Sequence, residues 1–369
     1  MNEPKDAIER VASFEIILTR YLDTEGRPLA ALPEWTADPD RVRSMYRSMV
    51  RTRAFDKKAV ALQRTGQLGT YAACLGQEAV GTAVGMALRE DDVYIPAYRE
   101  YAAQFLRGVS MTEILLYWGG DERGMDYAAD SARQDYPLSV PIATHVPHAI
   151  GVAYAFRLRK QDRVVLASCG DGATSKGDFY EAVSSAKIWN LPIVFLVTNN
   201  QWAISLPRER QTGAQTLAQK GIAGGIAGQQ VDGNDVIATY EILNQAIAAA
   251  RAGEGPQLVE AITYRLHDHT TADDARRYRS EDEVKTAWAR CPIKRLRAYL
   301  ESQDAWSAGD EESLQTEAVA TAESAAQAFT AMETEPPETI FDHLYAELPS
   351  SMRWQREEVA ARGPVEGAH

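Results

Sequence analysis

The stretch Val164-Val-Leu-Ala-Ser-Cys169-Gly170-Asp171-Gly172-Ala173 decides the fold, because an apolar run of strand length leads directly into a glycine-containing turn. A second apolar run, Ile193-Val-Phe-Leu-Val-Thr198, follows a segment with helical spacing, and a third occupies 258–264. Strands that are apolar throughout and separated by helices are typical of a parallel sheet covered on both faces. The sequence therefore predicts an α/β fold, a parallel sheet flanked by helices.

Helical patterns surround these strands. Asp38-Pro39 predicts a helix start, with Asp38 as N-cap and Pro39 in the first turn. Further helices are expected at 76–88, 235–251, 295–302, 310–332 and 340–348, before a loose tail of about a dozen residues. We therefore divide the chain into an N-terminal arm (1–40), an α/β domain (41–295) and a helical C-terminal extension with its tail (296–369).

Composition restricts the class of protein and its partners. The 369 residues are 45% hydrophobic and 25% charged, as in ordinary globular proteins. A net charge of −13 disfavours nucleic acid, and the apolar runs are too short to span a bilayer. The N-terminus lacks a signal-peptide pattern, and the three cysteines are far apart. We expect a cytoplasmic protein that binds neither nucleic acid nor membranes.

Polar motifs follow two predicted neighbouring strands. Gly170-Asp171-Gly172 ends one strand and Asn199-Asn200 ends the next, so both should lie at one edge of the sheet. Glycines let a backbone approach a ligand, and a helix N-terminus attracts an anion. A carboxylate beside a phosphate requires a cation between them. Asp171, Asn200 and the carbonyl of Trp202 could therefore hold Mg²⁺ or Ca²⁺ against a diphosphate.

Each motif alone has a simpler explanation. Gly-Asp-Gly is a common turn, and an asparagine pair can merely cap a helix. A dinucleotide-binding turn is a competing interpretation, but Ser175 occupies its third-glycine position and Thr198, not an acid, ends the next strand. The pair of motifs at this spacing is the specific signal.

Gly170-Asp-Gly172 through Asn199-Asn200 resembles the thiamine diphosphate motif. The longer stretch Gly170-Asp-Gly-Ala-Thr-Ser-Lys-Gly-Asp-Phe-Tyr-Glu181 makes the resemblance more specific. It resembles the alpha subunit of the thiamine-dependent 2-oxo acid dehydrogenases, and the similarity extends over residues 40–350. The resemblance implies a thiamine diphosphate-binding fold with Mg²⁺, in which Asp171, Asn200 and Trp202 bind the metal. It assigns cofactor contacts to Tyr98, Arg99, Val140, Ile142, Asp171, Gly172, Ala173, Asn200, Trp202 and His269.

The same resemblance gives individual roles. Tyr98 and Arg99 would hold the diphosphate, for which a guanidinium offers a fork of donors. Val140-Pro141-Ile142 would grip the aminopyrimidine, with Ile142 as the apolar wedge that bends the cofactor. His269 would face the cofactor as a catalytic residue suited to proton transfer near neutral pH, and Arg265 would support its loop.

Some positions depart from the family or stay open. Many relatives carry histidine where Tyr101 stands, and some carry one near Ala72, which leaves the substrate pocket unassigned. Asp178 and Glu181 lie one helical turn apart. They either line a passage between paired active sites, as the resemblance implies, or form a charge pair favoured by the helix dipole. His145 and His148 are expected in packing or interface roles.

The resemblance also implies partners and a reaction. The glutamate that activates the cofactor belongs to a separate beta chain, so we expect two alpha with two beta chains, joined partly through small-residue helices at 76–85 and 143–155. The assembly would decarboxylate pyruvate and pass the acyl group to a lipoyl group on an acyltransferase component. Branched-chain 2-oxo acids and acetoin are alternative substrates, and a noncatalytic assembly subunit is the alternative from another class.

Overall fold

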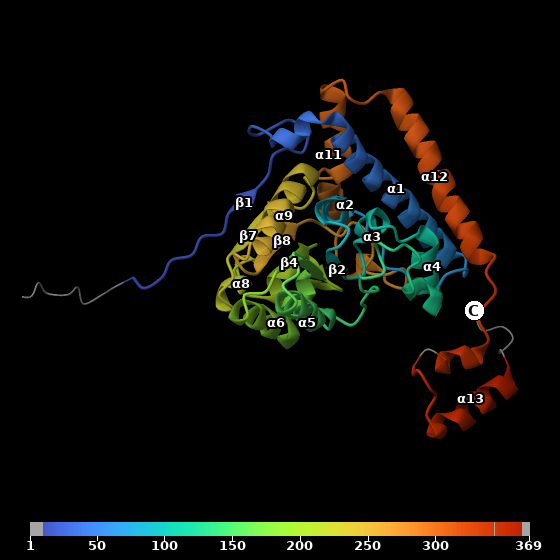
Figure 1. Ribbon diagram of the computed structural model, residues 1–369. Coiled ribbons are helices and arrows are strands. Elements are labelled where there is room, and N and C mark those ends of the chain that lie inside the picture. Colours follow the sequence, from blue (N-terminus) through green and yellow to red (C-terminus); the bar gives the residue numbers. More distant parts are fainter. Residues whose placement is uncertain (1–9, 343, 364–369) are drawn as a thin grey trace, which may run out of the picture.

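The computed structural model describes residues 10–342 and 344–363, and a six-stranded, all-parallel sheet forms its centre (Figure 1). The strand order is β1-β7-β8-β4-β3-β2. The strands are β1 Leu18–Thr19, β2 Val93–Ile95, β3 Val165–Gly170, β4 Ile193–Asn199, β7 Gly228–Asp232 and β8 Gln257–Ile262. Strands β5 Trp202–Ala203 and β6 Leu206–Pro207 form a small antiparallel pair. The predicted α/β fold is confirmed.

Helices cover both faces of the sheet (Figure 1). The longer helices are α1 Pro39–Arg64, α2 Glu78–Ala87, α4 Met111–Gly119, α5 His145–Leu158, α6 Gly177–Ile188, α9 Val236–Arg251, α10 Glu281–Trp288, α11 Pro292–Ser302, α12 Ala308–Thr330 and α13 Ser350–Arg362. The short helices are α3 Tyr101–Leu106, α7 Arg208–Gln211 and α8 Lys220–Ala223. Short 3₁₀ turns occupy Glu34–Ala37, Glu122–Met125, Asp171–Ser175, Ala275–Arg277 and Pro337–Phe341.

Strand β4 shows why an uninterrupted apolar run suits this sheet. Alternate side chains leave a strand on opposite faces. Ile193, Phe195 and Val197 pack with α5 and α6, whereas Val194 and Leu196 pack with α1, α2 and α9. Each side chain is almost fully buried, which stabilises the fold by about 1.5–3 kcal/mol relative to leaving it exposed. The two helical layers thereby fix the carboxyl ends of β3 and β4.

Helix α1 begins where the sequence predicts. The Asp38 side chain accepts hydrogen bonds from the backbone N–H groups of Asp40 at 3.0 Å and Arg41 at 3.4 Å, and Pro39 is the first helical residue. Helix α12 runs along α1 (Figure 1). Helices α11 and α12 contribute buried side chains to the same core as α1. The division of the chain at residues 40 and 295 stays a prediction.

The sequence analysis missed β1, β2 and β7. β1 and β2 have two and three residues, and β7 reads Gly-Gln-Gln-Val-Asp, so none offers a long apolar run. The predicted helix at 340–348 is wrong, because the 3₁₀ turn ends at Phe341 and α13 begins only after Pro349. Pro349 disfavours helical geometry in the residue before it. The loose tail expected over the last dozen residues is also wrong in part, since α13 continues to Arg362.

The small residues of α2 pack inside the chain, contrary to the expected role in a subunit interface. A Cβ on Gly85 would lie 2.7 Å from the Cβ of Leu106, so glycine permits the close approach of α2 to α3. Most of α2 is buried by other elements of the chain. The expected interface on α2 is therefore wrong, because this chain's own helices already occupy that surface.

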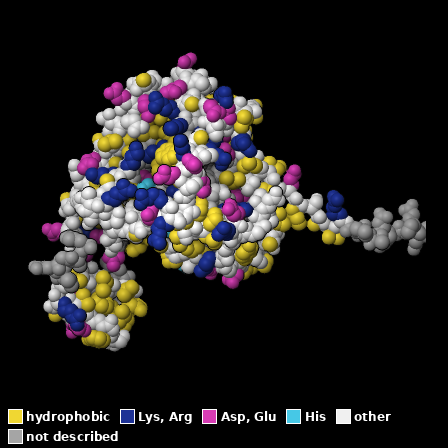
Figure 2. Space-filling model, turned by 180° about the vertical axis from the view of Figure 1, so that it is seen from behind, with side chains coloured by type: hydrophobic (Ala, Val, Ile, Leu, Met, Phe, Trp, Pro, Cys, Tyr) yellow, Lys and Arg dark blue, Asp and Glu magenta, His cyan; other side chains and the backbone are white. Residues whose placement is uncertain are grey.

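The C-terminal segment from Pro337 to Arg362 lies apart from the sheet (Figure 1). Figure 2 shows hydrophobic side chains gathered on this segment, and Ile340, Leu344, Tyr345 and Trp354 are among its exposed apolar residues.

None of the described helices is both long enough and apolar enough to cross a membrane.

Candidate functional site

A cavity of about 210 Å³ opens at the carboxyl ends of β3 and β4. It is the crevice where open α/β sheets bind ligands. The predicted cofactor residues that line it are Tyr98, Arg99, Ile142, Asp171, Gly172, Ala173, Asn200, Trp202 and His269. The structure thus brings together residues that lie as far apart in the sequence as Tyr98 and His269.

Asp171 lies at the end of β3, in the 3₁₀ turn Asp171–Ser175. Its side chain is buried, and its Oδ2 has no hydrogen-bond partner among the described residues. Burial raises the pKa of Asp171 to about 6, against the lowering effect of the backbone N–H groups of Asp171 and Gly172. The regular helix α6 begins at Gly177, after this turn. A buried carboxylate with a free oxygen is suited to a cation.

The two asparagines at the end of β4 point to different partners. Asn199 donates from Nδ2 to Oε1 of the buried Glu260 at 2.7 Å. Asn200 lines the cavity, where its Nδ2 donates to Oε1 of Gln77 at 3.2 Å and its Oδ1 accepts from the N–H of Trp202 at 3.2 Å. Asn200, not Asn199, can therefore offer its amide oxygen to a metal.

The backbone carbonyl of Trp202 faces a competing donor. Arg265 donates to it from Nη1 at 3.3 Å, and from Nη2 to the carbonyl of Ile204 at 2.7 Å. Arg265 is fully buried, and burial together with the charge of Arg99 lowers its pKa to about 10. Its guanidinium joins the loop after β4 to the loop after β8, and its supporting role in the active site stays a prediction.

Arg99 and Arg265 converge on His269. Arg99 Nη2 donates to His269 Nδ1 at 3.0 Å and to the His269 carbonyl at 2.6 Å, while Arg265 Nη1 donates to the same Nδ1 at 3.3 Å. A nitrogen that accepts from guanidinium groups carries no proton, so Nε2 carries it. Burial, followed by the charges of Arg99 and Arg265, lowers the pKa of His269 to about 3. His269 is therefore neutral at pH 7.

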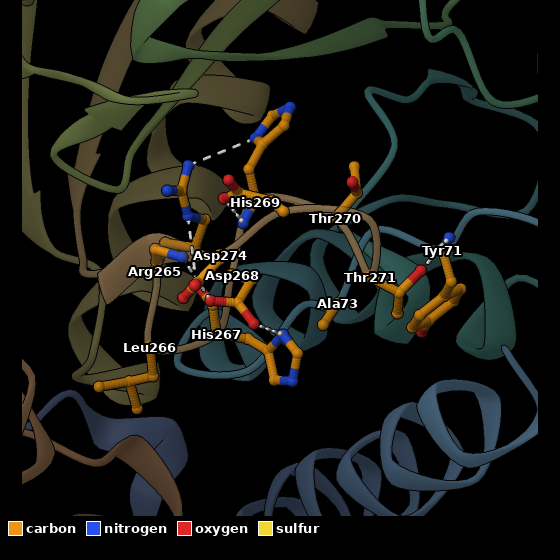
Figure 3. Close-up of polar contacts among 12 residues, drawn as sticks. Tyr71, Ala73, Arg265, Leu266, His267, Asp268, His269, Thr270, Thr271 and Asp274 are labelled. Carbon is orange, nitrogen blue, oxygen red and sulfur yellow. Dashed lines mark hydrogen bonds and ion pairs between the residues drawn. The ribbon is translucent and has the colours of Figure 1, made fainter. Parts of the chain in front are cut away.

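The loop after β8 separates its two histidines (Figure 3). Their rings point in opposite directions, His269 toward Arg265 and His267 toward Asp268. Asp273 accepts from the His269 N–H at 2.9 Å and from the Tyr278 hydroxyl, which ties the loop to the next turn. His269 lines the cavity and His267 does not, while the catalytic role of His269 stays a prediction.

The segment before α5 is held in an unusual backbone conformation. Ala143 is a buried non-glycine residue with φ of 63°, a left-handed geometry that costs free energy and recurs at functional sites. Ile142 lines the cavity with a side chain that is 41% exposed. Val140 is 44% exposed and its neighbour Ser139, rather than Val140, is among the described residues that line the cavity.

Four buried polar residues that the sequence analysis did not assign to the site also line the cavity: Gln77, Glu100, His145 and Thr198. Glu100 accepts from the Thr198 hydroxyl at 2.9 Å, and burial raises its pKa. His145 Nε2 lies 2.7 Å from the Ser168 carbonyl, and its Nδ1 has no partner within the described ranges. His145 is therefore buried, as a packing residue would be, but it also faces the cavity, which the sequence analysis did not predict. Gln77 follows Gly76 at the start of α2, a position that sequence reasoning treated only as helix.

The acids Asp178 and Glu181 lie outside this cavity, near the start of α6. Both are partly or largely exposed, and Asp178 pairs with Lys176 at 3.3 Å. This arrangement is compatible with both sequence-based hypotheses for the pair.

Comparison with known proteins identifies the family. Residues 46–338 match the family described as the dehydrogenase E1 component. The chain belongs to the dehydrogenase E1 component family. Over 358 residues it is 43% identical to the 3-methyl-2-oxobutanoate dehydrogenase subunit alpha of Mycobacterium tuberculosis, with 95% of each chain covered. It is also 36% identical over 349 residues to the pyruvate dehydrogenase E1 component subunit alpha of Staphylococcus aureus, with 94% of this chain and 93% of the relative covered.

Tyr101 and Ala72, which the sequence analysis left without a role in the substrate pocket, contact each other in this E1 chain. The Tyr101 hydroxyl donates to the Ala72 carbonyl at 2.8 Å, and its ring stacks on Tyr71 with centroids 5.6 Å apart. All three residues are buried. The hydrogen bond from Tyr101 thus holds the segment around Ala72 beside the site.

The E1 cavity fits a diphosphate with a divalent cation. Asp171 offers a free anionic oxygen, and Arg99 offers charged donors. Between 10 and 342 and from 344 to 363, no three His, Cys, Asp or Glu side chains form a metal-binding cluster. A metal at Asp171 would therefore depend on neutral oxygens and on the ligand's own phosphates for its remaining contacts.

Proposed function

We propose that this chain is the alpha subunit of a thiamine diphosphate-dependent 2-oxo acid dehydrogenase. The buried, unpartnered Oδ2 of Asp171 in a cavity that Arg99 also lines carries the proposal. The relatives' names as alpha subunits support a beta partner, and we propose two alpha with two beta chains in the cytoplasm. A lipoylated acyltransferase component would accept the acyl group.

Each site residue then has a defined task. Asp171, the amide oxygen of Asn200 and the carbonyl of Trp202 would hold Mg²⁺, with Arg265 competing for that carbonyl in the structure described here. Tyr98, Arg99 and the backbone at Gly172 and Ala173 would hold the diphosphate, while Val140 and Ile142 would position the aminopyrimidine. Arg99 would exchange its bonds to His269 for phosphate oxygens, which carry a full negative charge.

Thiamine diphosphate, when bound, supplies a nucleophilic carbon and an electron sink for decarboxylation. Without a bound diphosphate, His269 is neutral and carries its proton on Nε2. In that state it would donate a hydrogen bond rather than act as a charged acid. Neutralisation of Arg99 and Arg265 by a bound diphosphate would raise the pKa of His269 toward the range useful for proton transfer. Arg265 would orient the neutral imidazole through its hydrogen bond to Nδ1.

Two substrates have separate support. The higher identity, 43%, is to a 3-methyl-2-oxobutanoate dehydrogenase alpha subunit, which favours a branched-chain 2-oxo acid. Relatives named as pyruvate dehydrogenase alpha subunits are 33% and 36% identical, and the motifs around 211–220 and 231–233 favour pyruvate. We place 3-methyl-2-oxobutanoate first and pyruvate second.

The test uses the chain co-expressed with its beta partner. Calorimetry with thiamine diphosphate and Mg²⁺ should detect binding by the wild-type complex. Binding should be lost in Asp171→Asn and retained in Asp162→Asn, which changes an exposed carboxylate. Turnover of 3-methyl-2-oxobutanoate against pyruvate then ranks the substrates. Absence of binding by the wild-type complex would contradict the proposal and favour a noncatalytic assembly subunit.

A further inference from the structure

Gln77 lies buried at the edge of the candidate cofactor cavity. It directly precedes α2, and the preceding Gly76 adopts φ of 96°, where an added Cβ would lie 2.4 Å from the carbonyl oxygen of Tyr264. The Gln77 side chain is 2% exposed and lines the cavity. It makes no capping hydrogen bond to α2, although it occupies the N-cap position. The amide is therefore not used to cap α2.

The two ends of this amide differ. Its Oε1 accepts from Asn200 Nδ2 at 3.2 Å, whereas its Nε2 is buried and has no partner in the part of the chain that the structure describes. Buried donors are almost always hydrogen-bonded, because their desolvation is otherwise uncompensated. An unpaired donor at a cavity therefore indicates an acceptor that the cavity receives.

The contact also fixes the orientation of Asn200. Turning over either amide alone would set two NH₂ groups or two oxygens against each other. With Nδ2 of Asn200 directed to Gln77, its Oδ1 is directed to the opposite side, where an oxygen can serve a metal. One hydrogen bond thus fixes the orientation of two groups, the candidate metal ligand Oδ1 of Asn200 and the unpaired donor Nε2 of Gln77.

The chemistry of the acceptor follows from the neighbouring groups. Asp171 offers an unpartnered anionic oxygen in the same cavity, which calls for a cation, and Arg99 adds charged donors. An anionic oxygen bound beside that cation could accept from Gln77 Nε2. A neutral donor suits this place, because a lysine there would repel the cation.

We propose that Gln77 is a further cofactor-binding residue, which donates from Nε2 to a phosphate oxygen of thiamine diphosphate and orients Asn200 toward the metal through Oε1. This inference rests on the proposed function.

The experiment measures binding rather than turnover, with the alpha–beta complex and thiamine diphosphate as the probe. Calorimetry at saturating Mg²⁺ compares wild type with Gln77→Leu and Gln77→Glu. Gln77→Leu should weaken binding by about 10-fold or more, as for loss of a hydrogen bond to a charged group. Gln77→Glu should weaken it further, because a second carboxylate would face the phosphates. The Mg²⁺ concentration at half-maximal binding should rise in Gln77→Leu, because Asn200 loses its orienting partner.

The matched control is Gln104→Leu. Gln104 is equally buried, with Nε2 donating to the Tyr127 hydroxyl at 3.0 Å, but it does not line the cavity. Its variant should keep wild-type affinity, and thermal unfolding without cofactor checks that each variant folds. Wild-type affinity in either folded Gln77 variant would overturn the inference while leaving the proposed function intact. Failure of the wild-type complex to bind thiamine diphosphate would instead remove the proposed function and the inference with it.

Discussion

Arg99 binds both ends of His269, the imidazole Nδ1 at 3.0 Å and the backbone carbonyl at 2.6 Å. Its other nitrogen, Nη1, donates to the Ala73 carbonyl at 2.6 Å. One buried guanidinium therefore joins the segment before α2 to the loop after β8, across the cavity that would receive the diphosphate. A ligand that attracts Arg99 must alter the environment of His269 as well.

Replacing Arg99 by lysine should weaken thiamine diphosphate binding by about 10–100-fold. Lysine keeps the charge but loses the fork that contacts two acceptors at once, and hydrogen bonds to charged groups contribute about 1.5–3 kcal/mol each. Calorimetry on the alpha–beta complex measures the change. Arg89→Lys is the control, because Arg89 pairs with Asp162 at the exposed surface. Equal affinity in Arg99→Lys and wild type would exclude Arg99 from the diphosphate site.

Without cofactor, His269 should stay neutral far below pH 6.5. Its pKa is lowered to about 3, so the folded state takes up this proton at a lower pH than the unfolded chain does. The free energy of unfolding therefore decreases through this residue as pH falls from about 6.5 to 3. The ¹⁵N chemical shifts of the two ring nitrogens report the protonation state of the imidazole. The His269 signals should keep their neutral-form shifts at pH 5.5, where a histidine peptide is largely protonated. In Arg99→Met the protonation of His269 should begin at a higher pH, since one positive charge is gone.

Asp171→Asn should stabilise the cofactor-free protein at pH 7.5 while abolishing metal binding. Burial raises the pKa of Asp171 to about 6, so its folded state holds a proton more tightly than the unfolded chain. The stability that this proton provides is present at low pH and is lost as pH rises through 6. A neutral amide avoids that loss, so its Tm should exceed wild type by a few degrees at pH 7.5 and not at pH 4. A lower Tm at pH 7.5 would contradict this account.

The sequence could predict those parts of the molecule in which local chemistry determines structure. The strand ends at Asp171 and Asn200 follow from apolar runs of β3 and β4, and the start of α1 follows from Asp38 and Pro39. The meeting of Arg99 with His269 needed the family resemblance, because 170 residues separate them. No local pattern predicts which loop returns to which strand end.

Other features depend on tertiary contacts that no local pattern records. β7 pairs between β1 and β8 despite its polar sequence, because its neighbours satisfy its backbone groups. Gln77 becomes part of the site only because Asn200, 123 positions away, reaches its amide. The low pKa of His269 similarly arises from burial, from Arg99 in another segment and from Arg265 in its own loop.

Asn199 and Asn200 are adjacent, yet their alanine variants should fail in different ways. Asn199→Ala removes a donor from Glu260, which is fully buried and also accepts from the Ala218 N–H at 2.8 Å and from Gln230 Nε2 at 2.9 Å. Loss of a hydrogen bond to a buried carboxylate should destabilise the fold by about 1–3 kcal/mol. Asn200→Ala should instead weaken cofactor binding, because it removes a metal-facing oxygen and frees Gln77.

Chemical denaturation and calorimetry on both variants separate these effects. Asn199→Ala should have a lower free energy of unfolding and, in the folded fraction, an affinity for thiamine diphosphate with Mg²⁺ close to that of wild type. Asn200→Ala should lose affinity by about 10-fold or more at a smaller cost in stability. If the two variants behaved alike, the division between a fold-supporting Asn199 and a ligand-facing Asn200 would be wrong. Asn199→Asp sharpens the comparison, because a second carboxylate against Glu260 should destabilise the fold more than alanine does.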